Sequence, residues 1–184
     1  MRIEETSLPG LLLIHPDVFG DERGYFLELW NGGRYAPEGL DATFVQDNLS
    51  FSRRGVLRGL HFQEPLQGKL LTVLQGEVYD VALDIRLGSP TFGRWEGFSL
   101  RGEAKTQLYV PEGFAHGFAV VSETALFYYK CTTAYNPAGE RSVLWNDPDL
   151  GIDWPVKNPE LSARDQKGTP LAQFPRERLP IYGG

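Results

Sequence analysis

The sequence is poor in cysteine and has no long apolar run. Its 184 residues contain one cysteine, Cys131, without a CxxC partner, so no internal disulfide can form. Cys131 lies in an apolar, strand-like run, which favours a place in the core. The N-terminus carries acids where a signal peptide has bases, and no segment approaches the ~20 apolar residues of a membrane span. We therefore expect a cytoplasmic location and no membrane partner.

Basic charge is scarce as well. The net charge is -6, and no block of Lys or Arg interrupts the sequence. A surface that follows the phosphates of a nucleic acid is therefore not expected, although single basic residues can still hold one phosphorylated ligand. The charge favours a small ligand and no nucleic acid.

Short apolar runs separated by Gly, Pro, Asn and Asp dominate the chain. This spacing, without long helical periods, predicts a mainly β, antiparallel sandwich or barrel with a few short helical turns. The turns are expected near residues 32–38 and after residue 161. The predicted strands cover residues 11–15, 24–30, 43–50, 56–62, 69–74, 77–85, 95–100, 106–110, 118–121 and 125–132.

Alternation along these strands assigns side chains to faces. In residues 43–50, Gln46 and Asn48 share one face, whereas Asp47 lies on the other. In residues 77–85, Asp80 and Asp84 share a face with apolar neighbours. Polar groups on an enclosed face need partners, and a ligand is one kind of partner.

Residues 143–184 are irregular and rich in proline, with too few apolar residues for a core of their own. We expect this segment to cover the barrel, so that residues 1–184 form one domain. At 184 residues the chain is long enough for one full core and short for two.

The stretch from residue 55 to residue 76 concentrates the candidate chemistry. His61 stands between Arg58 and Lys69 in a run of strand-forming residues. A lone buried histidine is most often structural. Strict alternation puts Arg58 and His61 on opposite faces, so either Gly59 permits a bulge or one of the two points away. The bulge is the favoured hypothesis.

Two spaced patterns resemble the cupin superfamily, which implies a jelly-roll fold. One runs from Gly55 through His61 to Gly76, and the other is PEGFAHGF, with its histidine at His116. Metal-binding cupins have a second His at Gln63 and a Glu near Lys69, and both are replaced here. A cation at a ligand position repels a metal, so neither a metal nor another cofactor is expected.

A longer series of strings is similar to the dTDP-4-dehydrorhamnose 3,5-epimerase family, where dTDP is deoxythymidine diphosphate. The similarity spans about residues 7 to 175. The strings are FGDERGYFLE, FVQDNLS, RGLHFQ, QGKL, DVALDIR, PEGFAHGF, LWNDPDLGIDWP and ELSARD.

This resemblance implies epimerisation beside a ketone, which needs a base, a positive group and an acid. His61 matches the base, because a neutral imidazole can accept a proton at pH 7. Asp165 matches the residue that orients it, Lys69 the cation beside the C4 oxygen, and Tyr129 the acid on the opposite side. Tyr128 falls on the other face by alternation and is expected to pack in the core.

The resemblance also implies a set of substrate-binding residues and a homodimer in which the strand bearing Arg23 reaches the partner's site. Asp80 is expected behind the binding residues. Arginines suit the pyrophosphate, and the rings of Phe26 and Tyr135 suit thymine. The binding set is Arg23, Phe26, Glu28, Gln46, Asp47, Asn48, Arg58, His116, Tyr135, Glu140 and Arg164.

The expected reaction converts dTDP-4-dehydro-6-deoxy-D-glucose to dTDP-4-dehydro-L-rhamnose. Two alternatives stay open, namely an enzyme that epimerises one centre of a related dTDP-sugar and a cupin that binds a nucleotide sugar without turnover. A metal-dependent cupin oxygenase or isomerase is disfavoured by the missing ligands.

Overall fold

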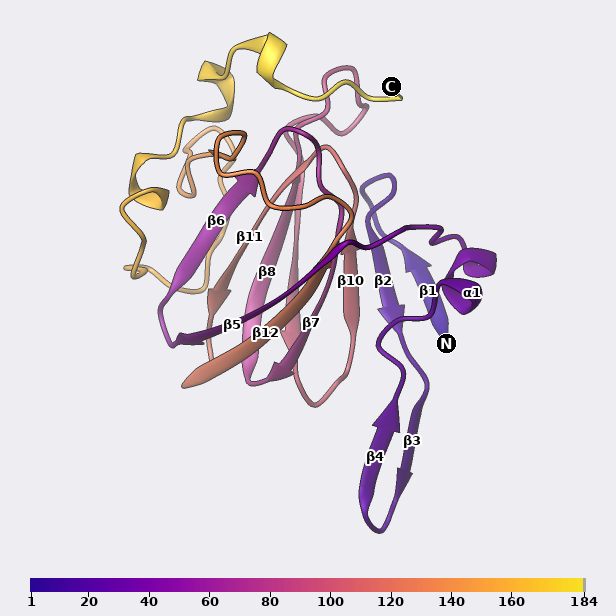
Figure 1. Cartoon of the computed structure of the whole chain (residues 1–184). Helices are drawn as coiled ribbons and strands as arrows, with labels where there is room; N and C mark the ends of the chain where they lie inside the picture. The colour runs from indigo at the N-terminus through magenta and orange to yellow at the C-terminus, as the bar shows by residue number, and fades with distance from the viewer. Residues whose placement is uncertain (184) are drawn as a thin grey trace.

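The computed structural model describes residues 1–183, and most of its strands form two facing antiparallel sheets (Figure 1). The six-stranded sheet contains, in spatial order, β1 (Arg2–Glu5), β2 (Leu12–His15), β10 (Gln107–Val110), β7 (Lys69–Gln75), β12 (Thr124–Cys131) and β5 (Gln46–Arg53). The five-stranded sheet contains β13 (Arg141–Ser142), β6 (Leu57–Phe62), β11 (Phe114–Val120), β8 (Glu77–Asp84) and β9 (Trp95–Arg101).

The core lies between the sheets, where alternate side chains of both meet. Leu71 and Phe127 from one sheet and Val78 and Phe118 from the other belong to the same buried cluster. The predicted mainly β, cupin-type fold is therefore confirmed. The helices are short, as predicted, and comprise α1 (Gly32–Tyr35) with the 3-10 turns η1 (Ala36–Glu38), η2 (Asp165–Lys167), η3 (Leu171–Gln173) and η4 (Arg176–Arg178).

Several predicted strand boundaries are wrong. The strand predicted at 43–50 begins at Gln46 and continues to Arg53, and β11 begins at Phe114, inside the PEGFAHGF string. The strand predicted at 24–30 ends at Leu27. Strands β1 and β13 escaped prediction because one is charged and the other has two residues. Such elements form because a neighbouring strand offers hydrogen bonds, not because of their own pattern.

The C-terminal segment lies over the outer face of the five-stranded sheet. Trp154, Leu171 and Leu179 are buried in one cluster with Leu57 and Val81 of that sheet. Backbone bridges join Val56 to Glu160 and Val143 to Thr169. Leu57 N donates to Glu160 O, and Asp165 is paired with His61, so the tail holds residues 160–165 against β6. Gly184, at the end of the expected cover, lies outside the described residues.

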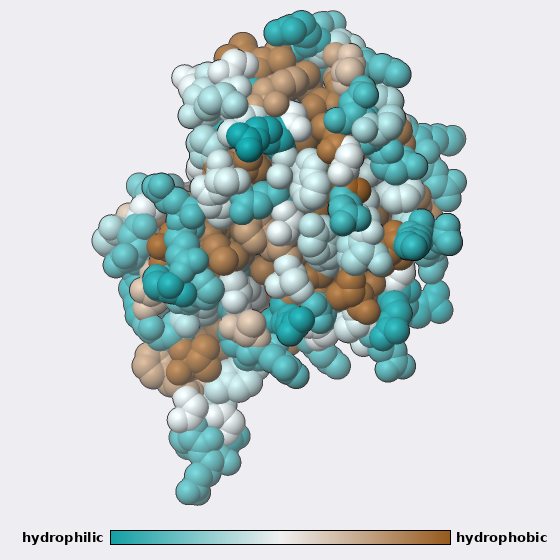
Figure 2. Space-filling model, turned by 180° about the vertical axis from the view of Figure 1, so that it is seen from behind, coloured by the Kyte–Doolittle hydropathy of each residue, from teal (hydrophilic) through white to brown (hydrophobic). Residues whose placement is uncertain are grey.

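Strands β3 (Val18–Asp21) and β4 (Gly24–Leu27) form a separate hairpin that projects from the body (Figure 1). Figure 2 shows its polar tip standing clear of the rest of the surface. The aromatic residues Phe19, Tyr25 and Phe26 are 58%, 58% and 69% exposed. Residues 1–183 contain no helix long and apolar enough to cross a membrane.

Candidate active site

A cavity of about 400 Å³ opens between the two sheets. Its walls come from β5, β7 and β12 on one side and from β6 and β11 on the other, and residues within the segments 63–67, 135–140 and 162–165 also line it. Eleven of the fifteen residues predicted from the sequence line it. They are His61, Lys69, Tyr129, Asp165, Gln46, Asn48, Arg58, His116, Tyr135, Glu140 and Arg164.

His61 is joined to Asp165 at the wall formed by β6. The His61 Nε2 atom lies 2.5 Å from Asp165 Oδ1, and Ser162 Oγ donates to Asp165 Oδ2 at 2.8 Å. Burial of Asp165 raises the pKa of its carboxyl, but the hydrogen bonds and charge of His61 and the bond from Ser162 outweigh it and hold that pKa below its ordinary value. An ionised Asp165 fixes the ring and stabilises its protonated form.

A bulge in β6 brings Arg58 into the same cavity as His61. In the pairing of β6 with β11, Arg58 lies opposite Phe118 and His61 lies opposite His116. Two residues of β6 but only one of β11 lie between these pairs, so β6 contains one extra residue. Gly59 has a φ of +121°, and a Cβ there would lie 2.6 Å from Gly117 Cα. The hypothesis of a bulge at Gly59 is thus confirmed, and only glycine fits this close approach.

Lys69 begins β7 on the opposite sheet, directly across from Cys131 of β12. Burial lowers the pKa of its ammonium, and the nearby Cys131 and Asp80 act in the other direction. A cation in such a poorly hydrated place interacts strongly with a negative oxygen brought close to it.

Tyr129 projects into the cavity from β12. Burial raises the pKa of its phenol and so does Cys131, while Arg58 opposes them. The hydroxyl therefore keeps its proton at neutral pH and can donate it. Tyr128 lies on the other face, as alternation predicted, but its expected place in the core is wrong because it is half-buried and its ring lies near the Lys130 ammonium.

His116 forms a second buried pair, with Asp80 behind it. The two Asp80 oxygens lie 3.0 and 2.9 Å from His116 Nε2, and Asp80 is fully buried. Burial lowers the pKa of His116, against the effect of Asp80. His116 reaches the cavity, whereas Asp80 touches it only through His116.

Polar side chains at the rim are tied to one another. Tyr135 Oη donates to Glu140 Oε2 at 2.7 Å, and Arg164 forms an ion pair with Glu140. On β5, Gln46 Nε2 donates to Asn48 Oδ1 at 2.9 Å. These groups form a polar mouth suited to an anionic, partly aromatic ligand.

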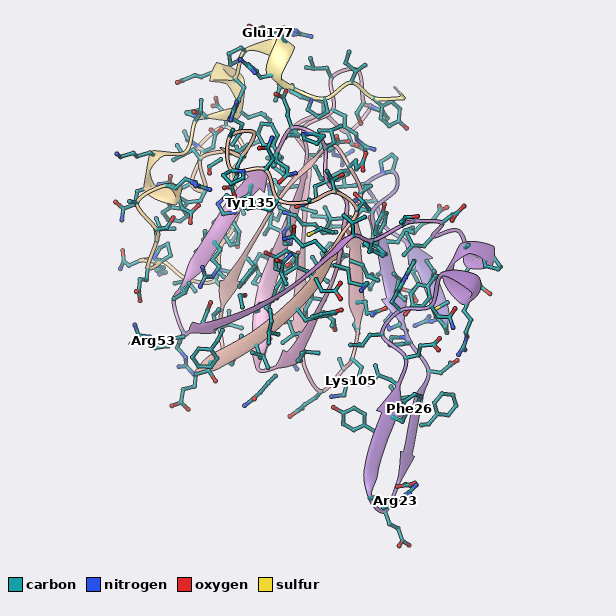
Figure 3. The ribbon with its side chains drawn as sticks, viewed as in Figure 1. Arg23, Phe26, Arg53, Lys105, Tyr135 and Glu177 are labelled. Atoms are coloured by element: carbon teal, nitrogen blue, oxygen red, sulfur yellow. The ribbon has the colours of Figure 1, made fainter. Side chains whose placement is uncertain are left out.

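Four predicted binding residues lie away from this cavity. Arg23 is 90% exposed at the hairpin tip and bound to Asp21, Phe26 lies along the hairpin, and Glu28 accepts from Asn31 (Figure 3). Asp47 pairs with Lys130 on the outer face of the sheet, because side chains alternate and its neighbours Gln46 and Asn48 point inward. We expected Asp47 to share a site with Gln46 and Asn48, but Asp47 does not line the cavity that they line.

Some residues that line the cavity were not predicted from the sequence as part of the site. Ser162 bonds to Asp165, and its signal was the Ser-x-x-Asp spacing in ELSARD. Gln63 is 4% exposed at the cavity wall, where it was noted only as a replaced ligand. Cys131 is buried, as predicted, and also lines the cavity. Within residues 1–183, no group of three or more His, Cys, Asp or Glu is placed to hold a metal ion.

Fold and site together define a cupin-type β sandwich whose cavity holds acid–base groups on both walls. The family model described as dTDP-4-dehydrorhamnose 3,5-epimerase matches residues 5–173. The chain therefore belongs to the dTDP-4-dehydrorhamnose 3,5-epimerase family, a family of isomerases.

Individual relatives agree with this assignment. A dTDP-4-dehydrorhamnose 3,5-epimerase of Salmonella typhimurium is 52% identical, over 94% of this chain and 97% of its own length. The crystal structure of an epimerase from Legionella pneumophila in complex with dTDP-4-keto-L-rhamnose has a TM-score of 0.96 and 50% identity, and covers 100% of this chain and 99% of that one. This chain spans 55% of a longer relative from Neisseria gonorrhoeae that is 50% identical.

The fold also accommodates a related activity. The 3'-monoepimerase ChmJ of Streptomyces bikiniensis, in complex with dTDP-quinovose, has a TM-score of 0.90 and 38% identity, and covers 96% of this chain and 92% of that one. A common fold is therefore compatible with one or two epimerised centres.

Proposed function

We propose that the chain epimerises C3 and C5 of dTDP-4-dehydro-6-deoxy-D-glucose to give dTDP-4-dehydro-L-rhamnose, without a cofactor. The observation that carries the proposal is the origin of the two proton-transferring groups. His61 comes from the five-stranded sheet and Tyr129 from the six-stranded sheet, so they stand on opposite walls of one cavity. Inversion needs proton removal from one face and proton return to the other.

The reaction begins with breakage of a C–H bond beside the C4 ketone. His61 Nε2 is engaged with Asp165, so Nδ1 is the nitrogen that takes the proton. The electron pair moves onto the C4 oxygen, and Lys69 stabilises the resulting enolate. The lowered pKa of Asp165 keeps its carboxyl ionised, and this negative charge stabilises the imidazolium.

Tyr129 completes each inversion. Its phenol donates a proton to the carbon from the opposite face, which reforms the ketone and leaves a phenolate. Arg58, whose charge opposes the rise in the Tyr129 pKa, stabilises that phenolate. Exchange with water then removes the proton from His61 and returns one to Tyr129, so the next centre can react.

The nucleotide occupies the rim. Arg58 and Arg164 suit the pyrophosphate, the ring of Tyr135 suits thymine, and Gln46, Asn48, His116 and Glu140 supply polar contacts. In support, the Bacillus anthracis relative, with 42% identity and a TM-score of 0.89, was solved with TDP and pyrophosphate bound.

Arg23, Phe26 and Glu28 act in the cavity of a second copy, in a cytoplasmic homodimer. The hairpin extends away from its own body and exposes aromatic rings (Figure 1, Figure 3). Strand β5 at the sheet edge exposes Leu49 and Phe51, which a partner strand would cover.

The test is incubation of the dTDP-4-keto sugar with protein in deuterium oxide, followed by NMR of the product. The proposal expects an inverted product with deuterium at both C3 and C5. Deuterium at one carbon would assign a mono-epimerase instead, and bound but unchanged sugar would assign a non-catalytic binding protein.

A further inference from the structure

Gln63 follows β6 directly and has every polar atom of its side chain engaged. Its Nε2 donates to Pro65 O at 3.1 Å and to Ala134 O at 3.0 Å. Its Oε1 accepts from Asn136 N at 3.2 Å. The side chain is 4% exposed, so these bonds are shielded from water and costly to lose.

The two bonds to the distant loop fall on either side of one residue. Ala134 and Asn136 flank Tyr135, whose own N–H donates to Gln46 Oε1 at 2.8 Å. The backbone is thus held at three consecutive residues, which fixes the position from which the Tyr135 ring projects. Figure 3 shows Tyr135 beside the upper ends of the strands, far from the hairpin.

Tyr135 in turn contacts the charged groups of the rim. Its hydroxyl donates to Glu140 and accepts from Arg164 Nη1 at 3.4 Å. A displacement of the Tyr135 backbone therefore moves the nucleotide-facing groups together, while His61, Lys69 and Tyr129 are held by their own strands.

We propose that Gln63 is a positioning residue for nucleotide recognition, acting through Tyr135 and the rim that Tyr135 organises. The inference rests on the proposed function for the identity of the nucleotide. At the position where a metal-binding cupin carries a ligand, this chain uses an amide to hold a binding loop. The role separates binding from chemistry, because Gln63 touches no group assigned to proton transfer.

The experiment compares Gln63→Ala and Gln63→Met with Gln173→Ala, a control whose side chain is exposed outside the cavity. The Met variant keeps the volume of the side chain and removes its hydrogen bonds. Both Gln63 variants are expected to raise the Kd for dTDP and the KM for the sugar nucleotide about tenfold, with kcat within about threefold of wild type. The control is expected to match wild type.

Hydrogen exchange provides a readout that needs neither turnover nor dTDP binding. In both Gln63 variants the amides of residues 134–136 should exchange faster, while those of β8 stay protected. Failure of wild type to bind dTDP would refute the proposed function, and exchange would still decide the role of Gln63.

A double-mutant cycle tests whether Gln63 acts through Tyr135. In a Tyr135→Ala background, Gln63→Met should raise the Kd for dTDP less than about twofold further. Additive effects, unchanged exchange at residues 134–136, or a fall in kcat at constant KM and Kd would each overturn the proposal.

Discussion

The cavity and the β3–β4 hairpin differ in what holds their side chains. Asp165 in the cavity is 2% exposed and bonded to two side chains that themselves belong to the body. The side chain of Arg23 on the hairpin is 90% exposed, and among residues 1–183 it is bonded to Asp21 of its own turn. One region is preorganised by the core, and the other is presented to solvent.

The proposed roles of the cavity and the hairpin differ in the same way. Burial raises the pKa of Tyr129, the proposed acid, and lowers that of Lys69, the proposed cation beside the enolate, and a single chain provides this burial. Arg23, Phe26 and Glu28, which are also assigned to binding, do not line the cavity between the two sheets. We therefore attribute proton transfer to a site within one chain, and part of substrate recognition to the association of two chains.

The largest expected effect is at the base. His61→Ala should lower kcat by about 10³-fold, because general acid–base groups contribute on the order of 10²–10⁴-fold. His15→Ala, outside the cavity, is the control and should leave kcat unchanged. Steady-state kinetics with the dTDP-sugar measures both, and near wild-type turnover by His61→Ala would refute the assignment of the base.

The next effect is at the acid. Tyr129→Phe should lower the rate of inversion about 10²-fold while His61 still removes the substrate proton, so exchange without inversion becomes visible. Tyr128→Phe changes the same group on the other face of β12 and should have little effect. NMR in deuterium oxide separates exchange from inversion. An equal loss of the inversion rate in Tyr128→Phe and Tyr129→Phe would contradict the assignment of Tyr129 as the acid on the wall opposite His61.

A smaller effect is expected on the hairpin. Arg23→Ala should raise KM about tenfold with kcat nearly unchanged, since it removes a binding charge far from the reacting carbons. Glu22→Ala, at the neighbouring exposed position, serves as the matched control. A large fall in kcat for Arg23→Ala would place the hairpin in the chemistry and erase the contrast with the cavity.

The smallest effect concerns stability against pH. The folded pKa of Asp165 is below its ordinary 3.8, so its contribution is present above that value and is lost as pH falls through the folded pKa. Asp165→Asn should therefore cost about 1–3 kcal/mol near pH 7 and progressively less below about pH 4. Urea unfolding across pH measures this.

Asp21 offers the hairpin counterpart of that measurement. Its pKa is also lowered, by hydrogen bonds from Arg23, but its side chain is exposed to solvent. Added salt should abolish any pH-dependent difference for Asp21→Asn and leave the Asp165→Asn difference in place. Equal salt sensitivity would show that burial does not distinguish the two carboxylates.

Alternation and glycine placement made much of the fold predictable. The bulge followed from the conflict between Arg58 and His61 around Gly59, and the opposite faces of Tyr128 and Tyr129 followed from period two. Alternation also placed Asp47 opposite Gln46 and Asn48, in conflict with the binding set implied by resemblance. The structure agrees with alternation for this residue.

Long-range pairings were beyond the sequence. The local pattern of β3, which reads VFGD, carries no strand signal, and its partner β4 supplies the order. The bonds from Gln63 to Ala134 and Asn136 join residues 71 and 73 positions apart. Hydrogen-bond geometry at such separations depends on how the sheets pack, which periodicity does not encode.

Subunit mixing tests the division between one chain and two most directly. His61→Ala chains are unfolded and refolded with equal amounts of chains carrying both Arg23→Ala and Phe26→Ala, and the activity is measured at low substrate. If each hairpin serves the partner's cavity, half of the dimers are mixed and each has one intact site, so about a quarter of wild-type activity returns. If each hairpin serves its own cavity, no combination holds an intact site, and the mixture will show no recovery above its separate components.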